Sequence, residues 1–185
     1  MRKFRLLRRK NIVSVFIIGL LMVYASSPFV YAATSYKLLG VYGYAQEMSN
    51  WCWAACERSI LNYFGFSPLP TQTQIVSTVY NPPVNQGVTM NQIAASLVSY
   101  GVNATATSSK LSFTSIESYI NNNQPIIADQ WGHATVIRGY YYNTSTSVYD
   151  VYWIDPWPSN PRYNITSYNT YKSEWIAGTV KDIWV

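Results

Sequence analysis

The stretch Gln46-Glu-Met-Ser-Asn-Trp-Cys-Trp-Ala-Ala-Cys56 is the segment around which the rest of the chain can be organised. A polar approach leads to a cysteine between two tryptophans, and small helix-forming residues follow. Ser49 or Asn50 is expected to cap the start of a helix, and Gly65 is expected to end it. The segment therefore predicts a helix that runs from about Asn50 to about Phe64.

This helix would carry Cys52 in its first turn. Unpaired N–H groups and the positive end of the helix dipole favour a thiolate over a thiol at that position. A thiolate needs a base to take its proton, and His133 is the one histidine of the chain. Cys56, four residues after Cys52, would form a strained disulfide at best and is interpreted as a small buried residue. Cys52 and His133 together indicate a thiol-dependent hydrolase.

The first 32 residues have the three-part pattern of a secretory signal peptide. Residues 1–10 are basic, residues 12–24 are apolar, and small residues lead to cleavage after Ala32 or Ala33. The apolar run of about 13 residues falls short of the ~20 that a membrane-spanning helix needs. We expect residues 1–32 to be a signal peptide and residues 33–185 to be one peptidase-sized domain. The mature protein would be secreted, extracellular and bacterial, with no stable membrane span after cleavage.

Removal of the signal peptide changes the charge of the protein. The whole chain has 13 Lys and Arg against 8 Asp and Glu, a net charge of +5, but six of the basic residues lie in the first ten positions. No basic patch remains after cleavage, so a nucleic acid is not an expected partner. One histidine and two cysteines on one helix do not supply a zinc site. No phosphate-binding glycine loop is present, and no cofactor is expected.

Helix patterns precede strand patterns along the chain. Thr34 to Ala45 is expected to be an extended lead-in. Further helices are predicted at 72–80, at 90–100 after a Thr89 cap, and from Ser112 or Thr114 onward. Strands are predicted at 102–107, 126–130, 133–142, 148–155, 162–165 and 177–185, the segments 133–142 and 148–155 forming a hairpin. This order predicts an α+β fold, with an N-terminal helical lobe, an antiparallel β-sheet lobe and the active site in the cleft between them.

Four polar residues occupy positions that nucleophilic catalysis requires. His133 opens one strand and Asp155 ends the next, so Asp155 can accept a hydrogen bond from His133 and fix its tautomer. Gln46 lies six residues before Cys52, and its amide can donate to an oxyanion together with the backbone N–H of Cys52. Each residue also has a plainer interpretation. His133 could be a satisfied polar group, Asp155 a turn former, and Gln46 a surface residue.

These residues resemble the active-site motifs of papain-like cysteine peptidases, especially bacterial members such as staphopains, plant-pathogen effector proteases and the leader peptidases of bacteriocin exporters. The resemblance covers residues 46–157. It implies that Gln46 serves the oxyanion hole, and that Cys52, His133 and Asp155 form the catalytic triad. Tryptophans are expected to shield the site or line the substrate at positions Trp51, Trp53 and Trp157.

The chain departs from the plant enzymes in three respects. Ser-Asn-Trp stands before the nucleophile in place of Cys-Gly-Ser, the papain disulfide framework is absent, and the chain is shorter. The resemblance implies a secreted, monomeric endopeptidase that acts on a peptide or protein substrate, and it leaves a proteinaceous inhibitor open as a partner. Two alternatives stand beside it: an acyltransferase or amidase of the same fold acting on cell-wall peptides, and a non-catalytic exported binding module with an aromatic surface.

Overall fold

The helix that carries the two cysteines begins later than the sequence predicts. The computed structural model describes residues 33–185, and in it α2 spans Cys52–Tyr63 with Trp51 as its N-cap and no side-chain cap. The prediction of a Ser49 or Asn50 cap is wrong because both residues bind Asn85. Asn85 Nδ2 donates to Ser49 Oγ over 2.9 Å, and the side-chain Nδ2 of Asn50 donates to the Asn85 carbonyl oxygen over 3.1 Å. The first turn of α2 is thus left without a capping side chain.

The other helices have side-chain caps at their starts. The helices α3 (Gln72–Val76), α4 (Met90–Ser99) and α5 (Phe113–Asn121) follow the caps Thr71, Thr89 and Ser112, and α6 (Tyr168–Glu174) follows Ser167. Helix α3 is shorter than the predicted 72–80. The Ser77 and Thr78 hydroxyls donate to the carbonyl oxygens of Thr73 and Ile75 over 2.9 and 2.7 Å, so they compete for the acceptors that a longer helix would use.

A seven-stranded sheet forms the second part of the fold. It has the order β2-β7-β3-β4-β5-β6, and β1 pairs with β4. The strands are β1 (Thr34–Leu38), β2 (Asn103–Thr107), β3 (Ile126–Gln130), β4 (His133–Asn143), β5 (Val148–Ile154), β6 (Tyr163–Ser167) and β7 (Trp175–Trp184). All pairings are antiparallel. The predicted lead-in therefore joins the sheet as β1, alongside the second half of β4.

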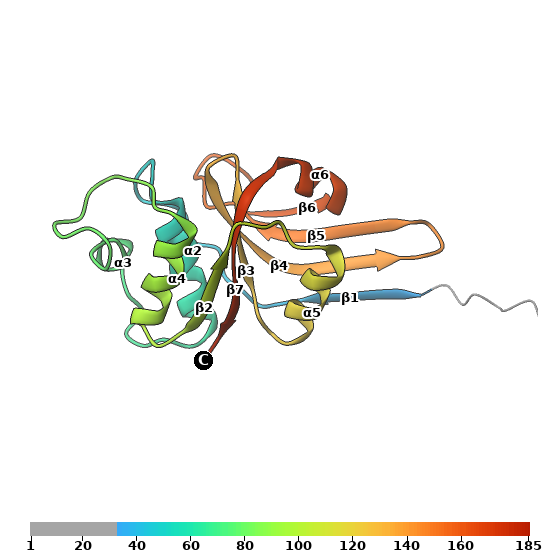
Figure 1. Cartoon of the computed structure of the whole chain (residues 1–185), viewed down its shortest axis with the longest axis horizontal. Coiled ribbons are helices and arrows are strands. Elements are labelled where there is room, and N and C mark those ends of the chain that lie inside the picture. Colours follow the sequence, from blue (N-terminus) through green and yellow to red (C-terminus); the bar gives the residue numbers. More distant parts are fainter. Residues whose placement is uncertain (1–32) are drawn as a thin grey trace, which may run out of the picture. The chain divides into compact units, whose positions relative to one another are not determined.

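Helices α2, α3 and α4 gather beside the strands β2, β3 and β7, whereas α5 lies by β1 and β4 and α6 lies by β5 and β6 (Figure 1). Helix α2 packs on β4 and α3, and α4 packs on β2 and β7. One continuous core connects the helices and the sheet, with Trp53, Ile60, Val136 and Trp175 each at most 1% exposed. The predicted α+β fold, with helices leading into an antiparallel sheet, is confirmed.

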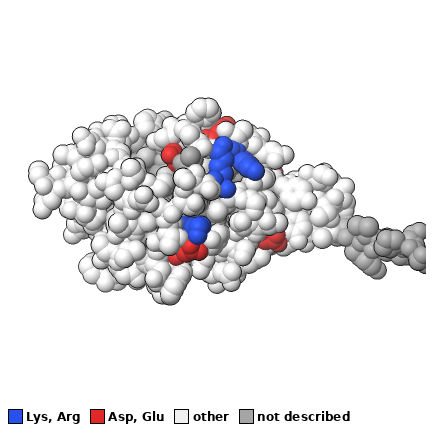
Figure 2. Space-filling view, viewed as in Figure 1, with Lys and Arg blue, Asp and Glu red and all other residues white. Residues whose placement is uncertain are grey.

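The face drawn in Figure 2 carries few charged side chains, in keeping with a charged fraction of 11% for the whole chain. Within residues 33–185, no helix has the length and apolar character to cross a membrane. The predicted signal peptide, residues 1–32, lies outside the described residues.

Candidate active site

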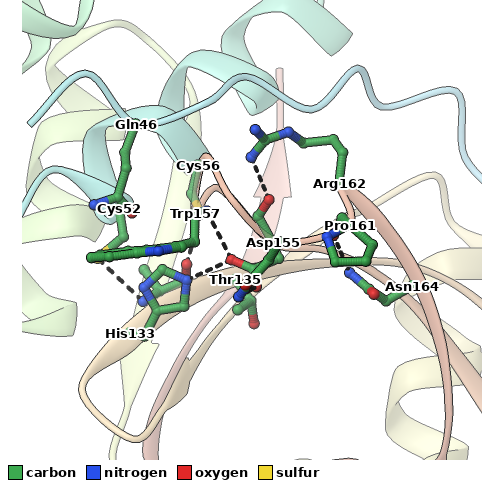
Figure 3. A network of polar contacts seen from close by, with 12 residues as sticks. Gln46, Cys52, Cys56, His133, Thr135, Asp155, Trp157, Pro161, Arg162 and Asn164 are labelled. Atoms are coloured by element: carbon green, nitrogen blue, oxygen red, sulfur yellow. Dashed lines mark hydrogen bonds and ion pairs between the residues drawn. The ribbon is translucent and has the colours of Figure 1, made fainter. Parts of the chain in front are cut away.

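Cys52 is the first residue of α2, at the end of the helix that has no side-chain cap. Its side chain is partly exposed, and its Sγ accepts the backbone N–H of Ala134 over 3.4 Å. Ala134 follows His133 at the start of β4, so this contact joins the helix to the strand that carries the imidazole. The helical part of the fold thus supplies the thiol, and the sheet supplies its neighbours (Figure 3).

His133 and Asp155 are brought together by the β4–β5 pairing. Val136 lies opposite Ile154, so the register continued by one residue places Asp155 across from Thr135, two residues from His133. His133 Nε2 lies 2.8 Å from Asp155 Oδ1. The contact leaves the other ring nitrogen unused by Asp155, and the neighbouring Cys52 side chain also raises the pKa of the imidazole.

The environment of His133 favours its charged form. Burial alone would lower the pKa of this imidazole, but hydrogen bonds to Asp155 and Cys52, together with the charges of both groups, raise it from 6.5 to about 9. The His133 side chain is 26% exposed, so the ring is partly shielded from water. A protonated imidazole beside a thiol is the pair of groups that covalent catalysis by a cysteine uses.

Asp155 is held by a ring of donors that sequence reasoning did not foresee. It is 5% exposed. Its carboxylate accepts from the Trp157 N–H at Oδ1 and from Asn160 Nδ2 at Oδ2, each over 2.8 Å, and Arg162 binds its carbonyl oxygen. Burial would raise the pKa of Asp155, but the bonds from His133, Asn160 and Trp157 lower it. The sequence does contain a signal for these contacts. Asn160 and Arg162 follow the Asp-Pro-Trp-Pro segment closely, and both residue types can donate to an Asp in a turn.

Gln46 is placed beside the turn that leads into α2. Its backbone N–H donates to the Pro156 carbonyl over 2.9 Å, which ties this turn to the segment that follows Asp155. Its side chain is buried, and Nε2 donates to the carbonyl oxygens of Met48 and Ser49 over 3.0 and 2.9 Å. Both amide hydrogens are therefore engaged with the turn in this conformation.

The three tryptophans of the prediction occupy different environments. Trp51 and Trp53 are 7% and 1% exposed, and their indole N–H groups donate to the carbonyls of Val84 and Gln86 over 2.9 and 3.1 Å. They hold the loop at 81–88 against α2. Trp157 is 39% exposed and lies edge-to-face with the His133 ring, at a centroid separation of 6.1 Å. The two rings lie beside each other in Figure 3.

Cys56 lies behind the site. It is 1% exposed, and both cysteines are free thiols. Cys56 Sγ donates to the Ala134 carbonyl over 3.3 Å, so the two cysteines contact the N–H and the C=O of the same residue. Burial, followed by the charges of Cys52, Asp155 and Glu57, raises the pKa of Cys56 well above its ordinary value. The interpretation of Cys56 as a small buried residue is confirmed.

Two cavities with different lining residues border the catalytic group. One, of about 80 Å³, is lined by Cys52, Trp53, Ala134 and Asp129 among others. The other, of about 270 Å³, is lined by His133, Trp157 and Asn160. Across residues 33–185, no three His, Cys, Asp or Glu side chains converge as a metal site would require.

Comparisons with known proteins identify the family and the fold of the chain. The sequence profile of the Peptidase_C39 like family matches residues 38–180. No curated protein matches the sequence. A putative C39-like peptidase from Bacillus anthracis superposes with a TM-score of 0.58 and 13% identity, over 80% of this chain and 97% of that one.

Two further solved structures share the fold. A double glycine motif protease from an AMS/PCAT transporter, solved in complex with the leader peptide, has a TM-score of 0.56 and 15% identity, over 80% of this chain and 95% of that one. UfSP from C. elegans has a TM-score of 0.57 and 14% identity over 81% of this chain, which spans only 34% of that protein. At these identities the structures show the fold, and the profile shows the family. Because the profile matches well over half of this chain, the chain belongs to the Peptidase_C39 like family, a family of cysteine peptidases with a papain-like α+β fold.

Proposed function

We propose that this cysteine peptidase is a secreted endopeptidase that uses Cys52 as nucleophile, His133 as general acid and base, and Asp155 as the group that orients the imidazole. The observation that carries the proposal is the 2.8 Å contact between His133 Nε2 and Asp155 Oδ1, made while Cys52 Sγ binds the next residue of the same strand. Nucleophile, base and orienting group thus stand in the order that covalent catalysis needs.

The reaction follows from this order. Cys52 Sγ attacks the scissile carbonyl carbon and forms a C–S bond, and the carbonyl oxygen takes up the negative charge. His133 donates its proton to the leaving amine as the C–N bond breaks. A water molecule, deprotonated by His133, then attacks the thioester, so that the acid product leaves and the thiol is restored.

The developing oxyanion needs donors near Cys52. The backbone N–H of Cys52 is available for this role because Cys52 is the first residue of α2 and its N–H has no acceptor within the helix. Gln46 Nε2 is the proposed second donor. In that role it exchanges one of its two carbonyl partners, Met48 or Ser49, for the substrate oxygen. The Trp157 ring keeps water from the bond between His133 and Asp155.

Secretion is proposed from the residue pattern of positions 1–32 alone, and a peptide or protein is the proposed substrate. The test is cleavage of a mixed peptide library, followed by mass spectrometry, with wild type, Cys52→Ala and the matched variant Cys56→Ala. Cleavage is expected with wild type and Cys56→Ala, and it should be absent with Cys52→Ala. Cleavage that persists in Cys52→Ala contradicts the proposal, and products joined to an added amine in place of free acids would assign the protein to acyl transfer.

A further inference from the structure

Asp129 presents a carboxylate beside Cys52 that the catalytic group does not use. It is the second-last residue of β3, and its backbone pairs with Ala134. It lines both the cavity of about 80 Å³ that Cys52 borders and a larger one of about 570 Å³. Val88 and Met90 line both spaces as well. We call the space along Val88, Met90 and Asp129 the Asp129 groove.

The carboxylate of Asp129 is only partly satisfied within the protein. Oδ1 accepts the Gly132 N–H over 2.8 Å, which stabilises the turn before His133. Among residues 33–185, no Lys or Arg nitrogen forms an ion pair with it. Burial raises the pKa of Asp129, against the Gly132 N–H and the charge of His133, which lower it. A cation in the groove would replace the water that burial has removed from this carboxylate.

The position of the groove decides which side of the substrate enters it. His133 must face the leaving amine, so the cavity lined by His133, Trp157 and Asn160 lies on the leaving-group side. The smaller cavity of the Asp129 groove is lined by Cys52 and Ala134, and the His133 ring is not part of its lining. A side chain in the groove therefore comes from the acyl side of the scissile bond.

We propose that Asp129 determines specificity by selecting a lysine or arginine at one of the two residues that precede the scissile bond. The proposal rests on the proposed function of Cys52 and deepens it. The apolar stem of the basic side chain would lie along Val88 and Met90, while its charged head binds Asp129 Oδ2. The substrate class is then a peptide with a basic residue just before the cleaved bond.

The experiment uses peptidyl chloromethyl ketones, which alkylate the nucleophile without any turnover. Lysine, norleucine, glutamate or glycine is placed at the last or the last-but-one residue, and the rate of Cys52 labelling is followed by intact mass. Lysine at one of the two positions is expected to react about tenfold faster than norleucine, an uncharged straight chain. In Asp129→Asn this ratio should fall to about one, because the negative charge that binds lysine is lost. The turn before His133 should be kept, because the amide oxygen still accepts the Gly132 N–H.

Asp150→Asn is the matched control, since it removes the same charge from β5, where Asp150 pairs with Tyr141. It should leave the lysine preference unchanged. Equal rates for lysine and norleucine in the wild type overturn the inference, as does a lysine preference that Asp129→Asn retains. Reaction confined to the glycine reagents also overturns it, and so does a complete lack of labelling. Lysine-selective labelling without peptide hydrolysis would instead overturn the proposed function and leave the inference standing.

Discussion

His133 Nε2 lies 2.8 Å from Asp155 Oδ1, and this contact governs the charge of the imidazole. Burial opposes the charged form, yet the bonds to Asp155 and Cys52 raise the pKa of His133 from 6.5 to about 9. A raised pKa means that the contribution to folding stability is fully present below about pH 6.5 and is lost as the pH rises through about 9. The imidazolium that protonates the leaving amine disappears as the pH rises through about 9.

The alkaline limb of activity is therefore expected near the pKa of His133. In wild type, kcat/KM for a cleaved peptide should hold through the neutral range and decline as the pH rises through about 9. In Asp155→Asn the carboxylate charge is lost, so the decline should move to lower pH. A full pH profile of each protein checks this, with Asp150→Asn as the control for the loss of one acid. An unchanged limb in Asp155→Asn would show that Asp155 does not act on His133.

Gln46→Ala tests the oxyanion role. If the amide donates to the transition state, kcat should fall about 100-fold or more with little change in KM. Thermal unfolding of the variant has to be measured alongside, because the Gln46 side chain also binds Met48 and Ser49 in the turn that leads into α2. A loss of less than about tenfold in a variant that folds normally would mean that Gln46 only supports the turn.

Cys56 is expected to be chemically silent in the folded protein. Its burial and raised pKa disfavour the thiolate that alkylating agents require. Iodoacetamide should modify one thiol per native molecule and both thiols in denaturant, with Cys52 as the native site by peptide mapping. Cys56→Ala should lower the free energy of unfolding by about 1 kcal/mol through the lost contacts. Modification of Cys56 at the rate of Cys52 would exclude this account.

The buried carboxyl of Glu57 makes the free energy of unfolding depend on pH. It is 0% exposed, Ser96 Oγ donates to Oε2 over 2.6 Å, and Oε1 has no partner among the described residues. Burial raises the pKa of Glu57 well above 4.5, although the Ser96 bond lowers it. Its contribution to stability is thus fully present below about pH 4.5 and is lost as the pH rises through the folded-state value.

Glu57→Gln removes this ionisation. The variant should be more stable than wild type by about 1 kcal/mol or more at pH 8 and nearly unchanged at pH 4. Urea unfolding at both pH values is the measurement. Glu47→Gln, at a side chain that is 46% exposed, is the control and should change stability by less than about 0.5 kcal/mol at either pH. Equal stability of wild type and Glu57→Gln at pH 8 would refute the interpretation.

Local signals in the sequence predict a large part of this structure. The Thr89 cap and the hairpin of β4 and β5 each depend on neighbouring residues, and the hairpin alone predicts that His133 and Asp155 meet. The start of α2 could not be predicted in this way. The side chains of Ser49 and Asn50 bind Asn85, which lies beyond α3 in the sequence, and so neither caps the helix.

The surroundings of the site also depend on long-range packing. Residue types alone do not show that β1 pairs with the end of β4, or that both cysteines of α2 contact Ala134. The role of Asp129 is of the same kind. Its strand was predicted, but the groove exists only because Val88 and Met90 come from another part of the chain.

The central claim is that His133 activates Cys52. The most direct measurement is the rate of Cys52 alkylation by iodoacetamide as a function of pH, in wild type and in His133→Ala, with the modified residue identified by peptide mapping. The account predicts rapid alkylation in wild type at pH 6 and at pH 7, where His133 is charged, and a loss of about tenfold or more in His133→Ala. Rates that coincide in the two proteins at every pH would contradict it.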